Sequence, residues 1–402
     1  MKTQGFLIGS LLLVSASAVG GIADKVIRSR IDGVDLIASP TAVKDVVTIY
    51  GSMPAGDAFA GTGNLAVPTL TAMMLDKGTT SSDKFAIAQR LESVGAHISF
   101  SVSEQTLDIQ AKCLRKDAPT IVHLIIEQMR SPAFSADEFE KARIQLTGAI
   151  RRSLEDTDTR ADIAFSRAVF PSGHPNRMAA AEDLLAAIER ATLADVKAFH
   201  AKYYGPAHVT FAIAGDLDLK PIQAQLRKDL EGWHGGVPAL SAPQAAPPDA
   251  AVTEPINMAD KTSVSVFIGQ ASGLRYSDSD ALALRVGAAV LGSGFTGRLM
   301  HVVRDQEGLT YGIYAAVDND TYTDGDWRVG ASFAPELLDK GVASTRREVE
   351  RWWREGVTQE ELTARKRDLI GSYKVSLATT DGLARALLRT VQRGKPLSWP
   401  DD

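Results

Sequence analysis

The sequence predicts an α+β protein made of two homologous α/β sandwich domains, each a mostly antiparallel sheet with helices packed on it. Two observations support this fold class. A Pro- and Ala-rich stretch without apolar periodicity, residues 238–251, interrupts the patterned sequence and is typical of an interdomain linker. On either side of it, helix-like and strand-like segments follow in the same order, which indicates an internal duplication. We therefore predict domains over residues 24–237 and 252–402.

The first eighteen residues have the pattern of a secretory signal. Lys2 precedes an apolar run from Phe6 to Val14, and an Ala-Ser-Ala cleavage pattern ends at Ala18. The apolar run is shorter than the roughly 20 residues that a membrane-spanning helix needs. We expect cleavage near Ala18, a periplasmic or otherwise extracytoplasmic protein, and no stable membrane span after cleavage. A signal anchor that stays uncut is the alternative.

The first copy has apolar residues at helical spacing before Gly95 and alternating apolar residues after it. The predicted order is a helix, two strands, two long helices, a further segment and a last strand: residues 84–94, 96–102, 106–113, 118–130, from Ser135 onward, 193–206 and 208–216.

The second copy repeats this order. A helix ends at Gly308, and two strands and two long helices follow: residues 309–317, 326–333, 336–355 and from Thr358 onward. Gly95 and Gly308 take the same place, where glycine commonly ends a helix. Ser135 and Thr358 also correspond, as helix N-caps with a following Glu. No counterpart of the last strand follows, so we expect the second copy to be incomplete at its C-terminal end.

The composition is that of an ordinary globular protein, with 45% hydrophobic and 23% charged residues among 402. Its net charge of -5 argues against nucleic acid as a partner, since phosphate binding requires a basic face. The single cysteine, Cys113, cannot form an intrachain disulfide. It lies in an alternating apolar run, which predicts a core residue and not a nucleophile.

The segment around Gly308 places two hydrogen-bond donors near a joint between helix and strand. Arg304 lies in the last turn of the predicted helix, and Tyr311 lies near the start of the strand. Such a joint can aim a guanidinium and a phenol at one carbonyl oxygen or oxyanion. The spacing of these two residues alone favours a structural role for both of them. That role makes Arg304 an ion-pair partner of its acidic neighbours Asp305 and Glu307, and Tyr311 a half-buried strand residue.

Several short motifs occur in one order along the chain: Gly78-Thr79, 91–96 (LESVGA), 170–175 (FPSGHP), 203–206 (YYGP), 213–216 (IAGD) and 303–311 (VRDQEGLTY). With these motifs the chain resembles the pitrilysin/insulinase-type zinc peptidases, which include the mitochondrial processing peptidase and its bacterial relatives. The likeness extends over roughly residues 46–387, and the ordered set is far more specific than any single motif.

The zinc motif of that family is absent from this chain. Active members carry H-x-x-E-H on a helix, where two His bind zinc and the Glu activates the metal-bound water. The corresponding positions are Thr69, Ala72 and Met73, and a further Glu ligand of the family falls at about Gly148 or Ala149. None of these side chains can replace an imidazole ligand or a carboxylate base. The resemblance therefore implies no metal in this chain.

In the family, a subunit without zinc ligands that keeps the Arg and Tyr can pair with a subunit of the opposite kind. The resemblance implies that Arg304 and Tyr311 stabilise a substrate carbonyl in such a pair, with zinc in an H-x-x-E-H partner and a peptide or unfolded protein as substrate. The chain alone would then be inactive. One alternative is a catalytically silent scaffold or peptide-binding module of the same fold. The other is a stand-alone peptidase with unrecognised ligands.

Overall fold

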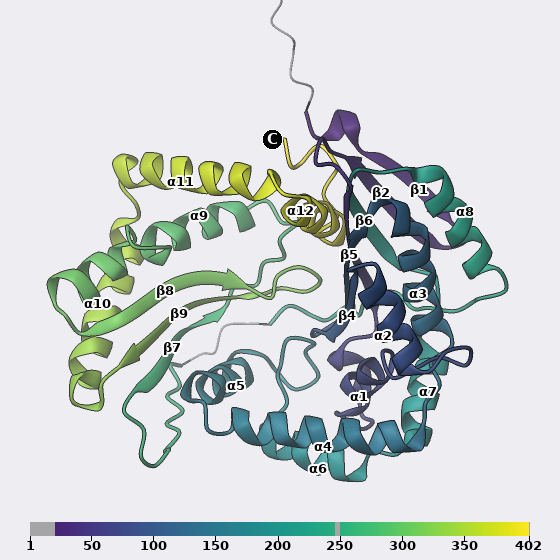
Figure 1. Cartoon of the computed structure of the whole chain (residues 1–402). Helices are drawn as coiled ribbons and strands as arrows, with labels where there is room; N and C mark the ends of the chain where they lie inside the picture. The colour runs from purple at the N-terminus through teal and green to yellow at the C-terminus, as the bar shows by residue number, and fades with distance from the viewer. Residues whose placement is uncertain (1–20, 246–249, 402) are drawn as a thin grey trace, which may run out of the picture.

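The computed structural model describes residues 21–245 and 250–401, so the predicted signal, residues 1–18, lies outside the described part. Figure 1 shows two sheets on opposite sides of the molecule, each accompanied by helices. This arrangement confirms the predicted fold class of two α/β sandwiches. Among the described helices, none combines the length and apolar character that crossing a membrane requires.

The sheet of the first half is mixed. Its strands β2 and β6 pair in parallel, and its other neighbours pair antiparallel. The order across the sheet is β1 (Ile27–Ile31), β2 (Val34–Pro40), β6 (Thr210–Gly215), β3 (Val46–Pro54), β5 (Thr106–Leu114) and β4 (His97–Val102).

One face of this sheet packs on the helices of the first half. These helices are α1 (Val67–Met74), α2 (Lys84–Ser93), α3 (Ala118–Arg130), α4 (Ala136–Ser153), α6 (Ala181–Arg190), α7 (Leu193–Tyr203) and α8 (Leu219–Leu230). Alternate residues of β5, such as Ile109 and Cys113, join Leu70 and Ile121 of the helices in one buried core. Cys113 is 4% exposed, which confirms the predicted core residue, and this burial raises the pKa of its thiol to about 12.

The sheet of the second half has the same strand order as three strands at one edge of the first sheet. Its antiparallel order is β7 (Val264–Ala271), β9 (Asp326–Phe333) and β8 (Thr310–Asp318), matching β3, β5 and β4. The helix end at Gly95 has φ +62°, and the one at Gly308 has φ +65°. Both glycines adopt the left-handed conformation that a helix end requires. In the described part of the chain no strand pairs with the outer edge of β7, where a counterpart of β6 would lie.

The helices of the second half are α9 (Ala281–Gly292), a π-helix labelled η4 (Met300–Gln306), α10 (Leu338–Glu355) and α11 (Gln359–Leu377). At the start of α11, Thr358 and Glu361 form the predicted capping box. Ser135 occupies the N-cap position of α4, but its side chain makes no capping hydrogen bond.

Each half contributes one helix to the sheet of the other half. The C-terminal helix α12 (Thr380–Gln392) packs on β2, β3 and β6 of the first sheet. Its Leu387 is fully buried against Ile37 and Ala212. In return, α5 (Thr157–Val169) packs on β7 of the second sheet. This exchange joins the halves through two apolar cores.

A buried ion pair strengthens the contact between α5 and the second sheet. Arg328 of β9 is 6% exposed and donates to both carboxylate oxygens of Asp326, which is fully buried. Its Nη1 also donates to Asp162 of α5 at 2.5 Å. The guanidinium lies over the Phe165 and Phe267 rings, so cation–π contacts add to the ion pairs.

The second buried polar contact, which we call the latch, consists of His174, Asn176, Asp324 and the Ala245 backbone N–H. The side chains of His174 and Asp324 are each 1% exposed and lie 3.2 Å apart, Nε2 to Oδ1. The Asn176 N–H donates to His174 Nδ1, so Nε2 carries the proton that is donated to Asp324. Asp324 Oδ2 accepts from the Ala245 N–H at 2.9 Å. The latch thus ties the first half and the predicted linker to the loop between β8 and β9.

Candidate functional site

Arg304 and Tyr311 lie together at the joint between η4 and β8. Beyond the last turn of η4, the Leu309 N–H donates to the Val303 carbonyl at 2.9 Å, and Gly308 turns the chain into the strand. The guanidinium carbon of Arg304 is 5.5 Å from the centroid of the Tyr311 ring. The structure therefore brings the two predicted site residues to one place.

A β-bulge turns Tyr311 outward. Thr310 pairs with Phe333 and Gly312 pairs with Ser332, which leaves Tyr311 without a partner on β9. In regular alternation Tyr311 would share the face of Ile313, which is 4% exposed. The bulge instead leaves Tyr311 90% exposed.

The hydroxyl of Thr310 stabilises the bulge. Its Oγ1 donates to the Ser332 carbonyl at 2.6 Å, and the Gly312 N–H donates to Oγ1 at 3.2 Å. Threonine is common in strands because its branched side chain packs well there. The sequence alone therefore does not reveal that Thr310 orients the phenol of Tyr311.

The helix before the joint differs from the predicted amphipathic α-helix, because η4 is a π-helix. In its last turn the Glu307 N–H donates to the Val302 carbonyl, five residues earlier. Arg304 lies over a second ring, that of Phe295, at 5.3 Å from its centroid. Phe295 is 75% exposed and was missed as a site residue, although an aromatic residue within the glycine-rich segment 291–297 was the available signal.

Both donors are open to a ligand. Within the described residues, the Tyr311 hydroxyl makes no hydrogen bond, and Arg304 has a single ion pair, with Asp305 at 3.8 Å. Two aromatic rings hold the guanidinium in place without using its N–H groups. A carbonyl oxygen or carboxylate approaching this surface would therefore find unoccupied N–H and O–H donors.

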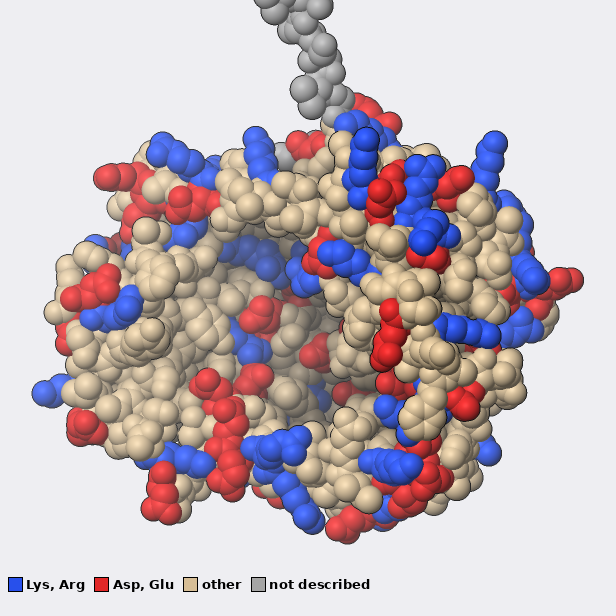
Figure 2. Space-filling view, in the orientation of Figure 1, with Lys and Arg blue, Asp and Glu red and all other residues tan. Residues whose placement is uncertain are grey.

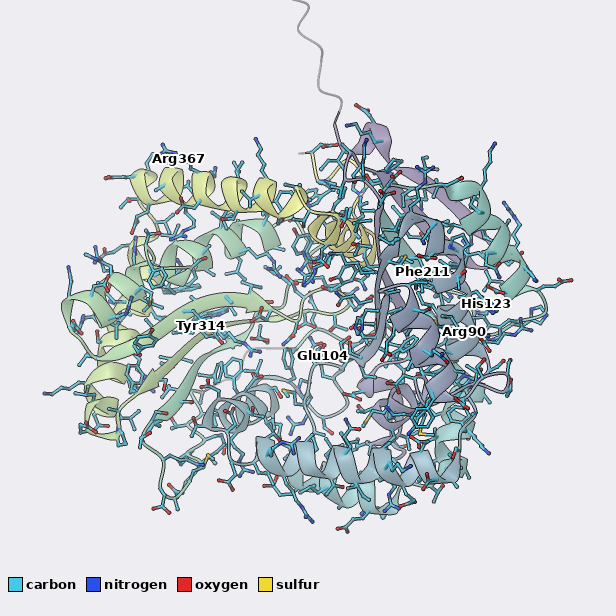
Figure 3. The ribbon with its side chains drawn as sticks, in the orientation of Figure 1. Arg90, Glu104, His123, Phe211, Tyr314 and Arg367 are labelled. Atoms are coloured by element: carbon cyan, nitrogen blue, oxygen red, sulfur yellow. The ribbon has the colours of Figure 1, made fainter. Side chains whose placement is uncertain are left out.

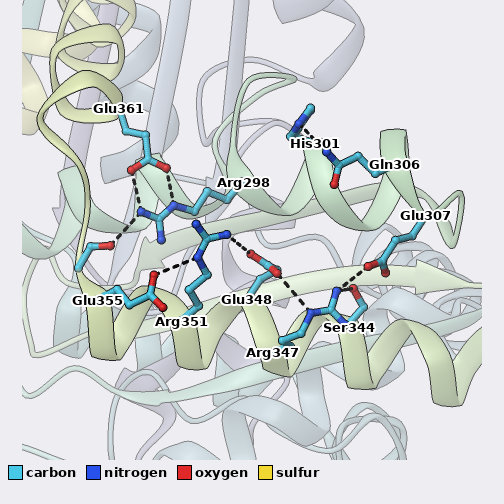
Figure 4. A network of polar contacts seen from close by, with 11 residues as sticks. Arg298, His301, Gln306, Glu307, Ser344, Arg347, Glu348, Arg351, Glu355 and Glu361 are labelled. Atoms are coloured by element: carbon cyan, nitrogen blue, oxygen red, sulfur yellow. Dashed lines mark hydrogen bonds and ion pairs between the residues drawn. The ribbon is translucent and has the colours of Figure 1, made fainter.

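Ion pairs fix both ends of η4, as Figure 4 shows. Before η4, Arg298 donates through two nitrogens to Glu361 of α11, and its Nη2 also donates to the Gly356 carbonyl at 2.9 Å. After η4, Arg347 of α10 donates to Glu307 at 2.5 Å. The position of Arg304 is thus set by contacts from two neighbouring helices.

The Arg298–Glu361 pair makes stability depend on pH. The hydrogen bond from Arg298 lowers the pKa of Glu361 from 4.5 to about 2. Because the folded pKa is lowered, the pair stabilises the fold above pH 4.5 and loses this contribution as the pH falls toward about 2. We expect Glu361→Gln to destabilise the protein at about pH 6 and much less at about pH 3, as measured by urea denaturation.

The matched control for this prediction is Glu360→Gln. Glu360 is exposed on the same turn of α11 and has no ion pair with a described residue. Its substitution should change the unfolding free energy little at either pH. A Glu361→Gln variant whose destabilisation is equal at both pH values would contradict the assignment.

The positions of the missing zinc motif lie on α1 and α4, two helices that pack against each other. Thr69 donates from Oγ1 to Asp57 at 2.9 Å, and Ala72 is 5% exposed. Met73 packs against the main core, and Gly148 lies on α4. In the part of the chain that the structure describes, no group of three His, Cys, Asp or Glu residues is placed to hold a metal. The two helices that carry the zinc motif positions are therefore present, but the side chains at those positions are not metal ligands.

Comparison with known proteins places the chain among peptidase relatives. The family model "Insulinase (Peptidase family M16)" matches residues 39–168, and "Peptidase M16 inactive domain" matches residues 190–369. A "Non-peptidase homolog YmxG" of Helicobacter pylori is 24% identical over 358 residues, 87% of this chain and 80% of that protein. An "Uncharacterized zinc protease YmxG" of Bacillus subtilis is 24% identical over 315 residues, 77% of this chain and 73% of that protein.

Solved structures have the same fold. A peptidase M16 inactive domain from Pseudomonas fluorescens has a TM-score of 0.83 at 24% identity, covering 94% of this chain and 90% of that chain. A protease from Helicobacter pylori has a TM-score of 0.80 at 17% identity, covering 94% of this chain and 91% of that chain. Since the two family models lie in sequence order and extend from residue 39 to residue 369, the chain belongs to the insulinase family of peptidases, family M16.

Proposed function

We propose that this chain is the non-zinc-binding subunit of a heteromeric zinc metallopeptidase that cleaves peptides or unfolded proteins. The observation that supports the proposal most is the pairing of an exposed Tyr311 with Arg304 in a chain whose motif positions hold no zinc ligand. A donor pair held by a bulge and a π-helix, with both groups open, suits a substrate that another subunit cleaves.

In the proposed complex, an H-x-x-E-H subunit of the same family holds the zinc, which supplies the activated water when bound. The residues of this chain bind and orient the substrate. The Tyr311 hydroxyl donates to the carbonyl oxygen on which negative charge develops, and Arg304 binds a neighbouring carbonyl or carboxylate. An oxyanion donor of this kind contributes about 3 kcal/mol to transition-state binding. We also propose an extracytoplasmic location, supported by the signal pattern ending at Ala18.

The proposal is tested by assaying the purified chain alone and then together with an H-x-x-E-H subunit. Alone, it should contain far less than one zinc per chain by elemental analysis and should cleave no unfolded protein, because Thr69, Ala72 and Met73 supply no ligand or base. The mixture should hydrolyse the substrate faster than the partner alone. Stoichiometric zinc together with hydrolysis by the lone chain would overturn the proposal.

A scaffold without a catalytic role is the second candidate. One relative is named "Non-peptidase homolog", and another, 21% identical over 267 residues, is "Cytochrome b-c1 complex subunit 1, mitochondrial" of Bos taurus. For a scaffold, the mixture would keep full activity after substitution of both Arg304 and Tyr311. That outcome would assign this chain an assembly role.

A further inference from the structure

A polar cavity of about 410 Å³ lies on the side of the first sheet that α12 covers in part. Its walls come from the hairpin of β4 and β5, the strand β3, the helix α12 and the loop between β8 and β9, with Asn176 from the segment after α5. Figure 3 shows Glu104, one of its lining residues, in the middle of the molecule between the two sheets. Figure 2 shows that this face is hollowed at its centre. The volume is within the range of about 300 to 1,000 Å³ that small-molecule sites have.

One wall of the cavity is acidic. It contains Glu104, at the turn between β4 and β5, and Asp108 of β5. Asp108 is oriented by Thr106, whose Oγ1 donates to the carboxylate at 2.7 Å. Burial raises the pKa of Asp108, and the nearby charge of Glu104 raises it further. A positive group on a ligand would favour the charged carboxylate and so offset the repulsion from Glu104.

The opposite wall is basic. Arg385 and Arg389 lie one turn apart on α12 and both line the cavity. Arg385 donates to the Tyr50 hydroxyl at 2.5 Å and pairs with Asp381 at 3.3 Å. Arg389 is exposed, and its side chain forms no ion pair or hydrogen bond with any residue of the described ranges.

The two walls do not neutralise each other directly. Arg389 is near enough to lower the pKa of Asp108, yet no ion pair joins these residues in the described chain. Opposite charges therefore line one cavity without a direct ion pair between them. The cavity is also lined by hydroxyl and amide groups that can donate to and accept from peptide groups, contributed by Ser99, Ser101, Gln110, Asn319 and Gln392.

We propose that this cavity binds a short peptide with free ends, its carboxylate at Arg389 and Arg385 and its ammonium at Asp108 and Glu104. The unpaired opposite charges would select a zwitterion, and the polar groups that also line the cavity suit a peptide backbone. The inference depends on the proposed function only for the source of the peptide, which a peptidase complex would release. Binding itself is a property of this chain alone, so it is tested without a partner.

The test is isothermal titration calorimetry of the full chain with trialanine. We expect saturable binding, and binding weaker by about ten- to hundredfold for trialanine acetylated at its N-terminus or amidated at its C-terminus. Arg389→Ala and Asp108→Asn should each weaken trialanine binding by a similar factor. Arg389→Lys should retain part of the affinity, because it keeps the charge without the planar fork. Free alanine should bind more weakly, since it has no peptide groups for the polar side chains of the cavity to bind.

The control variant is Arg367→Ala. Arg367 is exposed on α11 and points away from the centre of the molecule (Figure 3), and its substitution should leave binding unchanged. Thermal denaturation of each variant checks that the fold is intact. The absence of saturable binding up to about 10 mM trialanine, or equal affinity for either capped peptide, would overturn the proposal. Either result would leave the role proposed for Tyr311 untouched, since a separate assay measures it.

Discussion

Replacing Tyr311 by Phe is expected to lower the turnover of a complex with an H-x-x-E-H subunit by about 100- to 1,000-fold. The substitution removes one hydroxyl and keeps the ring that supports Arg304, 5.5 Å away. Because the phenol would act on charge that develops only in the transition state, kcat should fall and KM should change little. Steady-state kinetics on a peptide substrate would measure both, and elemental analysis would confirm that the partner keeps its zinc.

Tyr314→Phe is the matched control for this substitution. Tyr314 lies on the same strand, β8, but its ring packs against Gly330 of β9. Figure 3 shows Tyr314 on the ribbon of this strand. Loss of its hydroxyl should leave turnover within about twofold of the unmodified complex, since a surface substitution away from a site has little effect. Equal turnover for Tyr311→Phe and Tyr314→Phe would remove the catalytic role that we propose for Tyr311.

Local features of the fold could be predicted because they depend on local chemistry. Gly95 and Gly308 end their helices with positive φ, and a glycine after an apolar periodic run is a direct signal for this. The order of strands and helices on either side of the linker gave the duplication, since alternation and helical spacing are properties of short segments. The chain also contains the Thr358–Glu361 capping box that its sequence predicts.

The exchange of helices between the halves could not be predicted. Apolar residues such as Leu387 of α12 and Phe165 of α5 show that one face of each helix is buried, but they do not specify which sheet covers that face. Both helices pack on strands that are distant in sequence, so the sheet on which each helix packs depends on the folding of the whole chain. The spacing of apolar residues shows which face of a helix is buried, but only tertiary packing decides which sheet covers that face.

The candidate site was predictable in its residues and not in its geometry. Arg304 and Tyr311 were identified from the joint at Gly308 and from the family resemblance. The bulge at Tyr311 and the π-helix turn before it depend on backbone register, which no residue type in this segment specifies. Phe295 reaches Arg304 from a different segment, so spacing within residues 303–311 could not include it.

Replacing Asp324 by Ala is expected to reduce the free energy of unfolding by about 2–5 kcal/mol, because two buried donors lose their acceptor. These donors are His174 Nε2–H, at 3.2 Å, and the Ala245 N–H, at 2.9 Å. The His174 ring stacks on Phe170 with ring centroids 4.6 Å apart, so it cannot turn to water without losing that contact. Urea denaturation would measure the loss, and Asp137→Ala, at an exposed carboxylate on α4, should cost far less.

A double-mutant cycle separates the latch from a general loss of packing. His174→Phe removes the donor but keeps an aromatic ring against Phe170. If the buried pair is the main contribution, the double variant with Asp324→Ala should be more stable than the sum of the single losses predicts, by about 1–3 kcal/mol. The reason is that removing His174 also removes a donor that Asp324→Ala would leave unsatisfied. Additive losses would show that the two residues stabilise the protein independently, and the contact between the halves would then rest on the apolar cores of α5 and α12.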